Sequence, residues 1–111
     1  MQSKSKKIPL PVRRALRQLG EDVARWRKLR GLTQAQIADR AGISRDTVTR
    51  LERGDGGIST ENLLGVLRAL GVLDVFSKAI DPFESDLGRL RSGEDLPARV
   101  RPRQLGGGSD G

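Results

Sequence analysis

The sequence predicts an all-α fold of five helices in a compact bundle with flexible ends. Apolar residues recur every three or four positions between residues 12 and 80, the spacing that gives a helix one buried face. Hydroxyl residues precede and glycines follow most of these stretches, as is typical of helix starts and stops. We expect residues 1–11 to be a basic flexible arm and residues 81–111 to be an extended or disordered tail.

The first helix is expected from Val12 to about Arg30, because apolar side chains recur along it at helical spacing. Gly20 weakens this prediction, and the helix can split there into two pieces. Gly31 ends it. Trp26 falls on the apolar side and is expected in the core.

The second and third helices are short and joined by a single glycine. Thr33 and Gln36 have the spacing of a capping box, so the second helix begins at Thr33. Gly42 supplies a left-handed turn, and Ser44 caps the third helix. The residues expected to face inward are Ile37, Ala38, Ala41, Ile43, Val48 and Leu51.

The fourth helix is capped by Ser59 or Thr60 and closed by Gly71. A short fifth helix follows from Leu73 to Ile80 and is stopped by Asp81 and Pro82. The helical domain is therefore expected to span residues 12–80. Within the tail, residues 95–101 are the candidate for a stretch ordered against a protein surface.

Composition restricts the function. The chain has 111 residues, with 21 Lys and Arg against 14 Asp and Glu, and the first thirty residues alone carry a charge of +8. A basic segment beside a neutral middle favours a polyanionic partner, although it also suits a solubilising arm. Cysteine and histidine are absent, which excludes a disulfide framework, a zinc site and a Cys/His nucleophile. We expect no catalytic residue, metal or cofactor, and so no enzyme.

No run of about 18 apolar residues is present, and the basic start lacks the hydrophobic segment of a secretory signal. We therefore expect no membrane association and a cytoplasmic protein, associated with the nucleoid.

The third helix carries its polar residues on one side. With Val48 and Leu51 facing inward, Asp46, Arg50 and Arg53 fall on the opposite stripe, and Thr49 lies beside them. Arg45 and Thr47 lie at the edges. Two helices joined by this turn match a helix-turn-helix motif, and a polar stripe of this width fits the DNA major groove.

Residues 19–71 resemble the helix-turn-helix domain of the XRE, or lambda-repressor-like, family. The matching stretches are "RGLTQAQIADRAGIS", "TVTRLERG" and "STENLLGVLRALGV". The resemblance implies a five-helix lambda-repressor-like DNA-binding domain with a salt bridge between Arg27 and Glu52. It implies that Gln34 contacts a phosphate and that Ser44 and Thr47 contact the DNA backbone. The base-reaching residues that it implies are Arg45, Asp46, Thr49 and Arg50.

Residues 72–103 are similar to the C-terminal part of HipB-like antitoxins, through an Asp-Pro and an "LPARVR" element. This second resemblance implies a homodimer that represses its own operon at a palindromic operator and binds a HipA-type kinase toxin. The alternatives are a stand-alone or mobile-element XRE regulator without a toxin, and a protein-binding adaptor.

Several residues keep more than one interpretation. Arg50 either contacts a base or forms an ion pair with Asp46, one turn earlier on the helix. Asp46 either contacts a base or only stabilises the start of the helix, where a carboxylate interacts favourably with the helix dipole. Lys4, Lys6 and Lys7 follow the phosphate backbone, enter a minor groove or are simply solvated.

One recognition helix reads few base pairs, so we expect a dimer formed through the fifth helix, using Leu73, Val75, Phe76 and Ile80.

Overall fold

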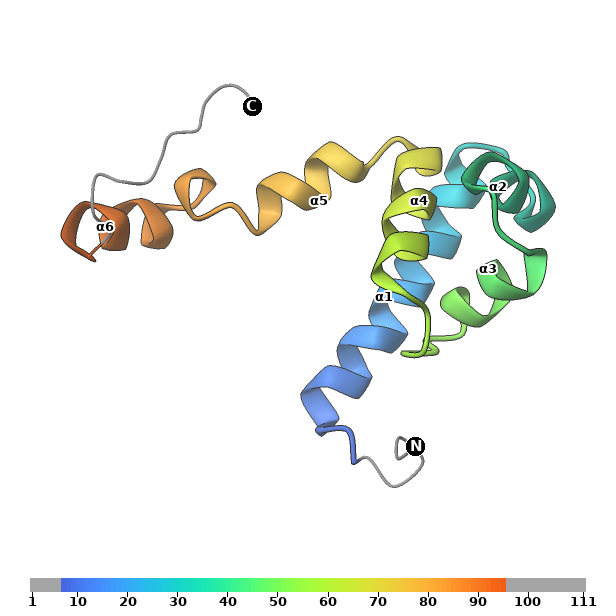
Figure 1. Ribbon diagram of the computed structural model, residues 1–111, viewed down its shortest axis with the longest axis horizontal. Helices are drawn as coiled ribbons and strands as arrows, with labels where there is room; N and C mark the ends of the chain where they lie inside the picture. The colour runs from blue at the N-terminus through green and yellow to red at the C-terminus, as the bar shows by residue number, and fades with distance from the viewer. Residues whose placement is uncertain (1–6, 96–111) are drawn as a thin grey trace. The chain divides into compact units, whose positions relative to one another are not determined.

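The computed structural model describes residues 7–95, all of whose regular elements are helical, so the predicted all-α fold class is confirmed (Figure 1). The chain divides into two compact units, with the boundary between Asp74 and Val75, inside the fifth helix. The elements are α1 (Leu10–Leu29), α2 (Gln34–Ala41), α3 (Arg45–Glu52), α4 (Thr60–Leu70), α5 (Leu73–Ala79), the 3-10 helix η2 (Pro82–Glu84) and α6 (Asp86–Asp95).

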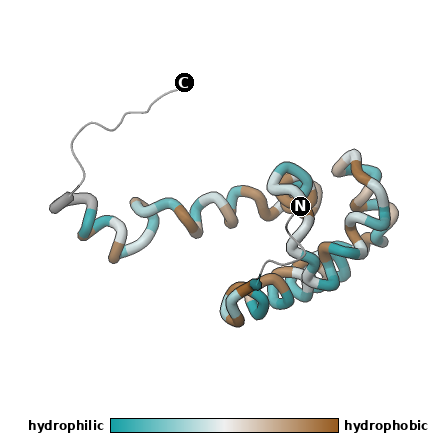
Figure 2. The backbone as a smooth tube through the Cα atoms, turned by 60° about the horizontal axis from the view of Figure 1, so that its bottom comes forward, coloured by the Kyte–Doolittle hydropathy of each residue, from teal (hydrophilic) through white to brown (hydrophobic). Residues whose placement is uncertain are grey.

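The first unit holds the core. Here α2 packs against both α3 and α4, and α1 packs against α3 and α4. Apolar positions recur along each helix as the sequence pattern requires (Figure 2). The buried apolar residues are Val23, Ile37, Ala38, Val48, Leu51, Val66, Leu67, Leu70 and Val72. Four of the six inward positions expected for α2, α3 and the turn between them are therefore buried, and Ala41 and Ile43 are half-buried.

Side-chain caps define where three of these helices begin. The capping box at Thr33 is present: the Gln36 N–H donates to Thr33 Oγ1 at 3.1 Å, and the Thr33 N–H donates to Gln36 Oε1 at 2.8 Å. Ser44 caps α3 by accepting from the Thr47 N–H. Ser59, rather than Thr60, caps α4.

The first helix differs from expectation at its start and at Gly20. It begins at Leu10, within the segment expected to be the flexible arm, because a proline at position 11 already has the backbone angle of a first helical turn. It also continues without a break through Gly20, which is buried. A Cβ built on Gly20 would lie 2.5 Å from the carbonyl oxygen of Glu52, so this glycine allows α1 to approach the end of α3.

Trp26 is not in the core, and the expectation that it packs there was wrong. Its side chain remains 41% exposed. The guanidinium carbon of Arg30, one turn later, lies 5.8 Å from the centre of the ring. The indole therefore has a cation–π contact with Arg30.

The extended or disordered tail expected from residue 81 onward is instead helical at residues 82–84 and 86–95. Asp81 and Pro82 stop α5 as predicted, but the Asp81 side chain accepts from the Phe83 N–H and starts η2. Ser85 then accepts from the Gly88 N–H at 2.9 Å, and α6 follows. Gly88 lies directly against the carbonyl group of Pro82, where a Cβ has no room. The remaining tail, including most of residues 95–101, lies outside the described residues.

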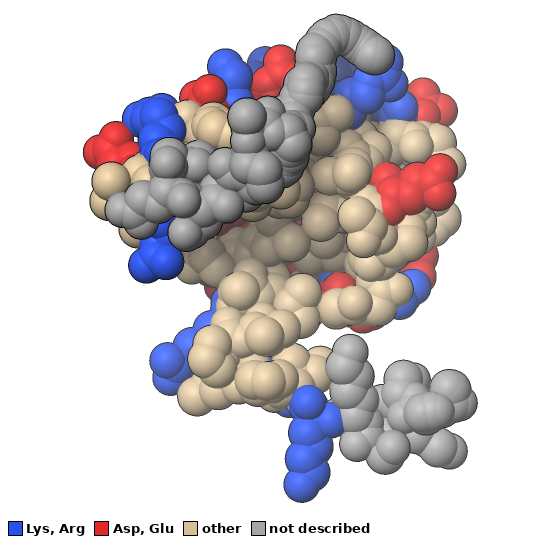
Figure 3. Space-filling model, turned by 60° about the vertical axis from the view of Figure 1, so that its left-hand side comes forward, with Lys and Arg blue, Asp and Glu red and all other residues tan. Residues whose placement is uncertain are grey.

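No described residue from Leu73 to Arg91 is buried. Among the described residues, no helix combines the length and apolar character needed to cross a membrane. Lys and Arg side chains are interspersed with Asp and Glu on the face shown in Figure 3.

Candidate nucleic-acid interface

The interface is built on α2 and α3, which are joined by a tight turn. Gly42 ends α2 at a positive φ of 71°, and Ser44 starts α3 two residues later. Ile37 and Ala38 of α2 and Val48 and Leu51 of α3 are buried. This packing uses the inner face of α3 and leaves its outer face available to a ligand.

Every predicted contact residue on α3 is polar and lies away from the core. Arg45, Asp46, Arg50 and Arg53 are exposed, and Thr47 and Thr49 are half-buried. Ser44 is also exposed, and its hydroxyl lies 2.8 Å from that of Thr47. The outer face thus presents three arginines, one carboxylate and hydroxyl groups, with no large apolar side chain among them.

Arg27 and Glu52 form the ion pair that the resemblance implied. Arg27 Nε donates to Glu52 Oε2 at 2.7 Å, and Nη2 donates to Oε1 at 3.1 Å. Arg27 Nη1 also donates to the carbonyl oxygen of Leu32 at 3.0 Å. The hydrogen bonds to Glu52 raise the pKa of Arg27 despite its partial burial. This pair links α1 to α3.

Gln34 connects the Arg27–Glu52 pair to Thr49 of α3, and we call these four residues the Glu52 cluster. Its Nε2 donates to Glu52 Oε1 at 2.9 Å, and its Oε1 accepts from the Thr49 hydroxyl at 2.9 Å. Because the carboxylate of Glu52 only accepts, the amide nitrogen must face it and the amide oxygen must face Thr49. Gln34 therefore has one amide hydrogen left for the phosphate contact that was expected of it.

Arg50 has a partner that sequence reasoning missed. Its Nε donates to Asp55 Oδ2 at 2.8 Å. The ion-pair partner of Arg50 is therefore Asp55, in the loop after α3, and not Asp46. The hydrogen bond to Asp55 raises the pKa of Arg50, and Asp46 contributes only a smaller effect. The pKa of Asp55 is lowered, first by the Gly57 N–H and then by Arg50.

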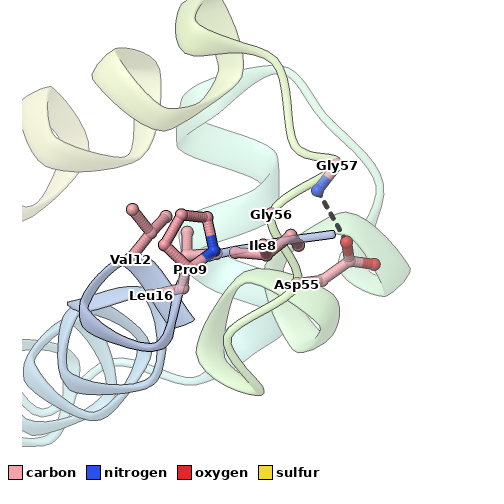
Figure 4. Close-up of a pocket in the computed structure, with 7 residues that line it drawn as sticks. All are labelled: Ile8, Pro9, Val12, Leu16, Asp55, Gly56 and Gly57. Carbon is pink, nitrogen blue, oxygen red and sulfur yellow. Dashed lines mark hydrogen bonds between the residues drawn. The ribbon is translucent and has the colours of Figure 1, made fainter. Parts of the chain in front are cut away.

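The loop after α3 packs against the start of α1. Ile8, Pro9, Val12 and Leu16 face Asp55, Gly56 and Gly57 across a groove of about 590 Å³ (Figure 4). The Gly57 N–H donates to Asp55 Oδ1 at 2.7 Å, the contact drawn as a dashed line in Figure 4. The exposed Lys7 immediately precedes this groove, whereas Lys4 and Lys6 lie outside the described residues.

The comparisons with known proteins agree with this geometry. A model of the helix-turn-helix family matches residues 23–74, from the second half of α1 into α5. No curated protein shows significant similarity to the chain. The family match and the packing of α2 on α3 together identify residues 34–52 as a helix-turn-helix motif, with α3 as its second helix.

Proposed function

We propose that the protein is a sequence-specific DNA-binding transcriptional regulator that places α3 in the major groove of double-stranded DNA. The observation that carries the proposal is the division of α3 into two faces. Val48 and Leu51 are 0% and 3% exposed, while the opposite face is wholly polar. A helix of this kind contributes little to the core beyond two side chains, and its outer face offers the groups that read base edges and phosphates.

The predicted contacts divide by chemistry. Side chains at the start of α2 and α3 are suited to phosphate oxygens, and the outer stripe of α3 is suited to base edges. We assign Gln34, Ser44 and Thr47 to the phosphate backbone, and Arg45, Asp46, Thr49 and Arg50 to bases, with Arg53 as a further DNA contact on the same side of the helix.

A protein-binding adaptor is the less favoured function. Protein-docking surfaces depend on a few large apolar or aromatic anchors at their centre. The outer face of α3 has none, and Trp26 lies on α1. The charged and hydroxyl character of α3 therefore supports DNA as the partner.

We further propose that the protein acts as a homodimer on a palindromic operator. Two recognition helices about 34–36 Å apart would double the number of base pairs read. Val75 and Ile80 of the second unit are 66% and 71% exposed, which suits them to an interface between copies. Leu73 and Phe76 are half-buried and complete the apolar set that was predicted for this role.

The finer proposal is an autorepressing antitoxin of a HipA-type kinase, which acts in the cytoplasm on the nucleoid. Its support is the resemblance of residues 72–103 to HipB-like proteins, and the family model ends at residue 74, near the start of that region. Repression would be steric, since a protein bound at a promoter operator blocks polymerase. A stand-alone or mobile-element regulator is the alternative, and a HipA-type kinase encoded next to this gene would favour the antitoxin.

A gel-shift series against the protein's own promoter tests DNA binding. We expect wild-type binding to weaken as salt rises and Arg50→Ala to lose specific affinity without unfolding. Arg68→Ala, which removes an exposed arginine from α4, is the matched control and should bind as the wild type does. Equal affinity of Arg50→Ala and wild type for the operator at physiological salt would contradict the base-contact role.

Truncation after Asp95 tests the role of the tail. If the protein is an antitoxin, we expect the truncated protein to lose kinase binding. If it is a stand-alone regulator, we expect the truncation to leave its operator affinity unchanged. A truncated protein that retains dimer, operator and kinase affinity would contradict the HipB-like assignment.

A further inference from the structure

We propose that Asp55 is a specificity-determining positioning residue, which holds Arg50 in the orientation that reads a base. The inference rests on the proposed DNA-binding function and names a residue beyond the predicted contact surface. Asp55 lies in the loop after α3, and its carboxylate accepts a hydrogen bond from Arg50. Its role is to bind the Nε–H of the guanidinium and so fix the direction of the two Nη atoms.

The way α3 ends brings the two residues together. Gly54 adopts a φ of +86°, which residues with a Cβ rarely adopt. The Gly54 N–H donates to the Leu51 carbonyl at 3.0 Å, and the Asp55 N–H donates to the Arg50 carbonyl at 3.0 Å. This pair of bonds is a Schellman motif, and it places the residue after the glycine over the residue five positions earlier.

The other helix ends in the first unit use the same pattern with a different residue. The residue after the positive-φ glycine is Leu32 at the end of α1, Ile43 at the end of α2 and Val72 at the end of α4. An apolar residue is usual there, because it packs against the last turn of its helix. Only on α3, among these described turns, is the residue a carboxylate. The other three turns show that a helix of this fold can end without an aspartate. Helix termination therefore does not explain why Asp55 lies opposite Arg50.

The carboxylate of Asp55 is also fixed by a hydrogen bond within its own loop. Its Oδ1 accepts from the Gly57 N–H at 2.7 Å (Figure 4), which leaves Oδ2 for Arg50. The loop backbone lies close on α1: a Cβ on Gly54 would be 3.1 Å from the Arg17 Cα, and one on Gly56 would be 2.9 Å from Leu16 Cδ1. Asp55 thus presents a fixed acceptor to Arg50.

This contact uses the part of the guanidinium that base recognition does not need. Arginine has five N–H donors, and Asp55 binds the one on Nε. The four N–H groups on the two Nη atoms remain, and a bidentate contact with guanine O6 and N7 needs two donors. Holding a flexible side chain in place before binding reduces the freedom lost on binding. The negative charge of Asp55 also repels phosphates, so its removal should not weaken non-specific binding.

The test is Asp55→Asn. The asparagine oxygen can still accept from Gly57, but its amide nitrogen would face Arg50 Nε with a donor instead of an acceptor. The preferred sites of wild type and Arg50→Ala are first selected from random duplexes, which identifies the base pair at which only the wild type discriminates. We expect Asp55→Asn to lose roughly tenfold in discrimination at that base pair, within the range of one bidentate contact, and to bind random DNA at least as tightly as wild type.

Two controls accompany it. Asp22→Asn breaks a comparable exposed pair, in which Arg25 Nη1 lies 2.8 Å from Asp22 Oδ1 on α1, and should leave the preferred site unchanged. The double variant Arg50→Ala/Asp55→Asn should have the preference of Arg50→Ala alone, because Asp55 acts through Arg50.

The outcomes separate the inference from the proposed function. If Asp55→Asn keeps full discrimination at that base pair, or gains discrimination there, the positioning role is overturned while DNA binding stands. If the wild type itself selects no preferred sequence, the proposed function fails and the inference fails with it.

Discussion

Two ion pairs on α3 have nearly the same bond length and different surroundings. Arg27 Nε lies 2.7 Å from Glu52, and Arg50 Nε lies 2.8 Å from Asp55. The side chains of the first pair are 13% and 7% exposed, whereas those of the second are 44% and 37% exposed. Burial, and not distance, therefore decides what each pair does.

The contrast shows that the same chemistry serves two purposes on one helix. The partly buried pair joins α1 to α3 and continues through Gln34 to Thr49, so breaking it leaves a charge that water cannot easily solvate. The exposed pair is solvated whether or not it forms, and contributes little to stability. Its value lies in the direction that it gives to Arg50.

The largest expected effect is that of Glu52→Ala on folding. It leaves Arg27 without its partner inside the domain, and we expect the free energy of unfolding to fall by about 3–5 kcal/mol. Urea denaturation measures this. The double variant Arg27→Met/Glu52→Leu should recover most of the loss, since no unpaired charge remains. If Glu52→Ala lowered the free energy of unfolding no more than Asp55→Asn does, the two ion pairs would not differ in their contribution to stability.

Gly20→Ala tests the close approach that this pair needs. Alanine favours a helix over glycine by up to about 1 kcal/mol, but its Cβ would meet the backbone of Glu52 and Leu51 at 2.5–2.6 Å. Since neither backbone can move freely, we expect a net loss of about 1–3 kcal/mol. Gly65→Ala on α4 is the matched control, because its Cβ would lie 3.7 Å from the nearest atom, an ordinary contact. It should be neutral or stabilising, and equal effects at the two sites would contradict this explanation.

Thr49→Val tests where the Glu52 cluster ends. It removes the hydroxyl that donates to Gln34 and keeps the shape of the side chain, so we expect a loss of about 0.5–1.5 kcal/mol in the free energy of unfolding. Thr49→Ser keeps the hydroxyl and should lose less. Equal losses would mean that packing, rather than the hydrogen bond, accounts for the effect.

The smallest expected effect is the pH dependence of the exposed pair. The pKa of Asp55 is lowered in the folded protein, so its ionised form stabilises the fold above the ordinary value of 3.8, and this contribution is lost as the pH falls below that value. Stability curves of wild type and Asp55→Asn should therefore run parallel near neutral pH and converge in strong acid. If the difference in stability between the two proteins grew as the pH fell, the ionised form of Asp55 would not be the one that stabilises the fold.

The helices and caps of the first unit could be predicted because each depends on neighbours within four residues. Thr33, Ser44 and Ser59 start helices through backbone N–H groups three positions ahead, and the apolar spacing alone indicated Val48 and Leu51 as buried. The second unit was misjudged because two glycines and polar residues obscured the start at Ser85, although the Ser85 cap is itself a local signal.

The sequence by itself determined the helical framework, the helix-turn-helix spacing and the polar outer stripe of α3, because these follow from local backbone preferences and a 3.6-residue period. It also contained the signal for Asp55, since the glycine at position 54 places the next residue over Arg50. Only the tertiary structure decided that Gln34 is shared between Glu52 and Thr49, that Gly20 touches the end of α3 and that Trp26 is exposed. These outcomes depend on how closely residues from different helices pack, which no local pattern specifies.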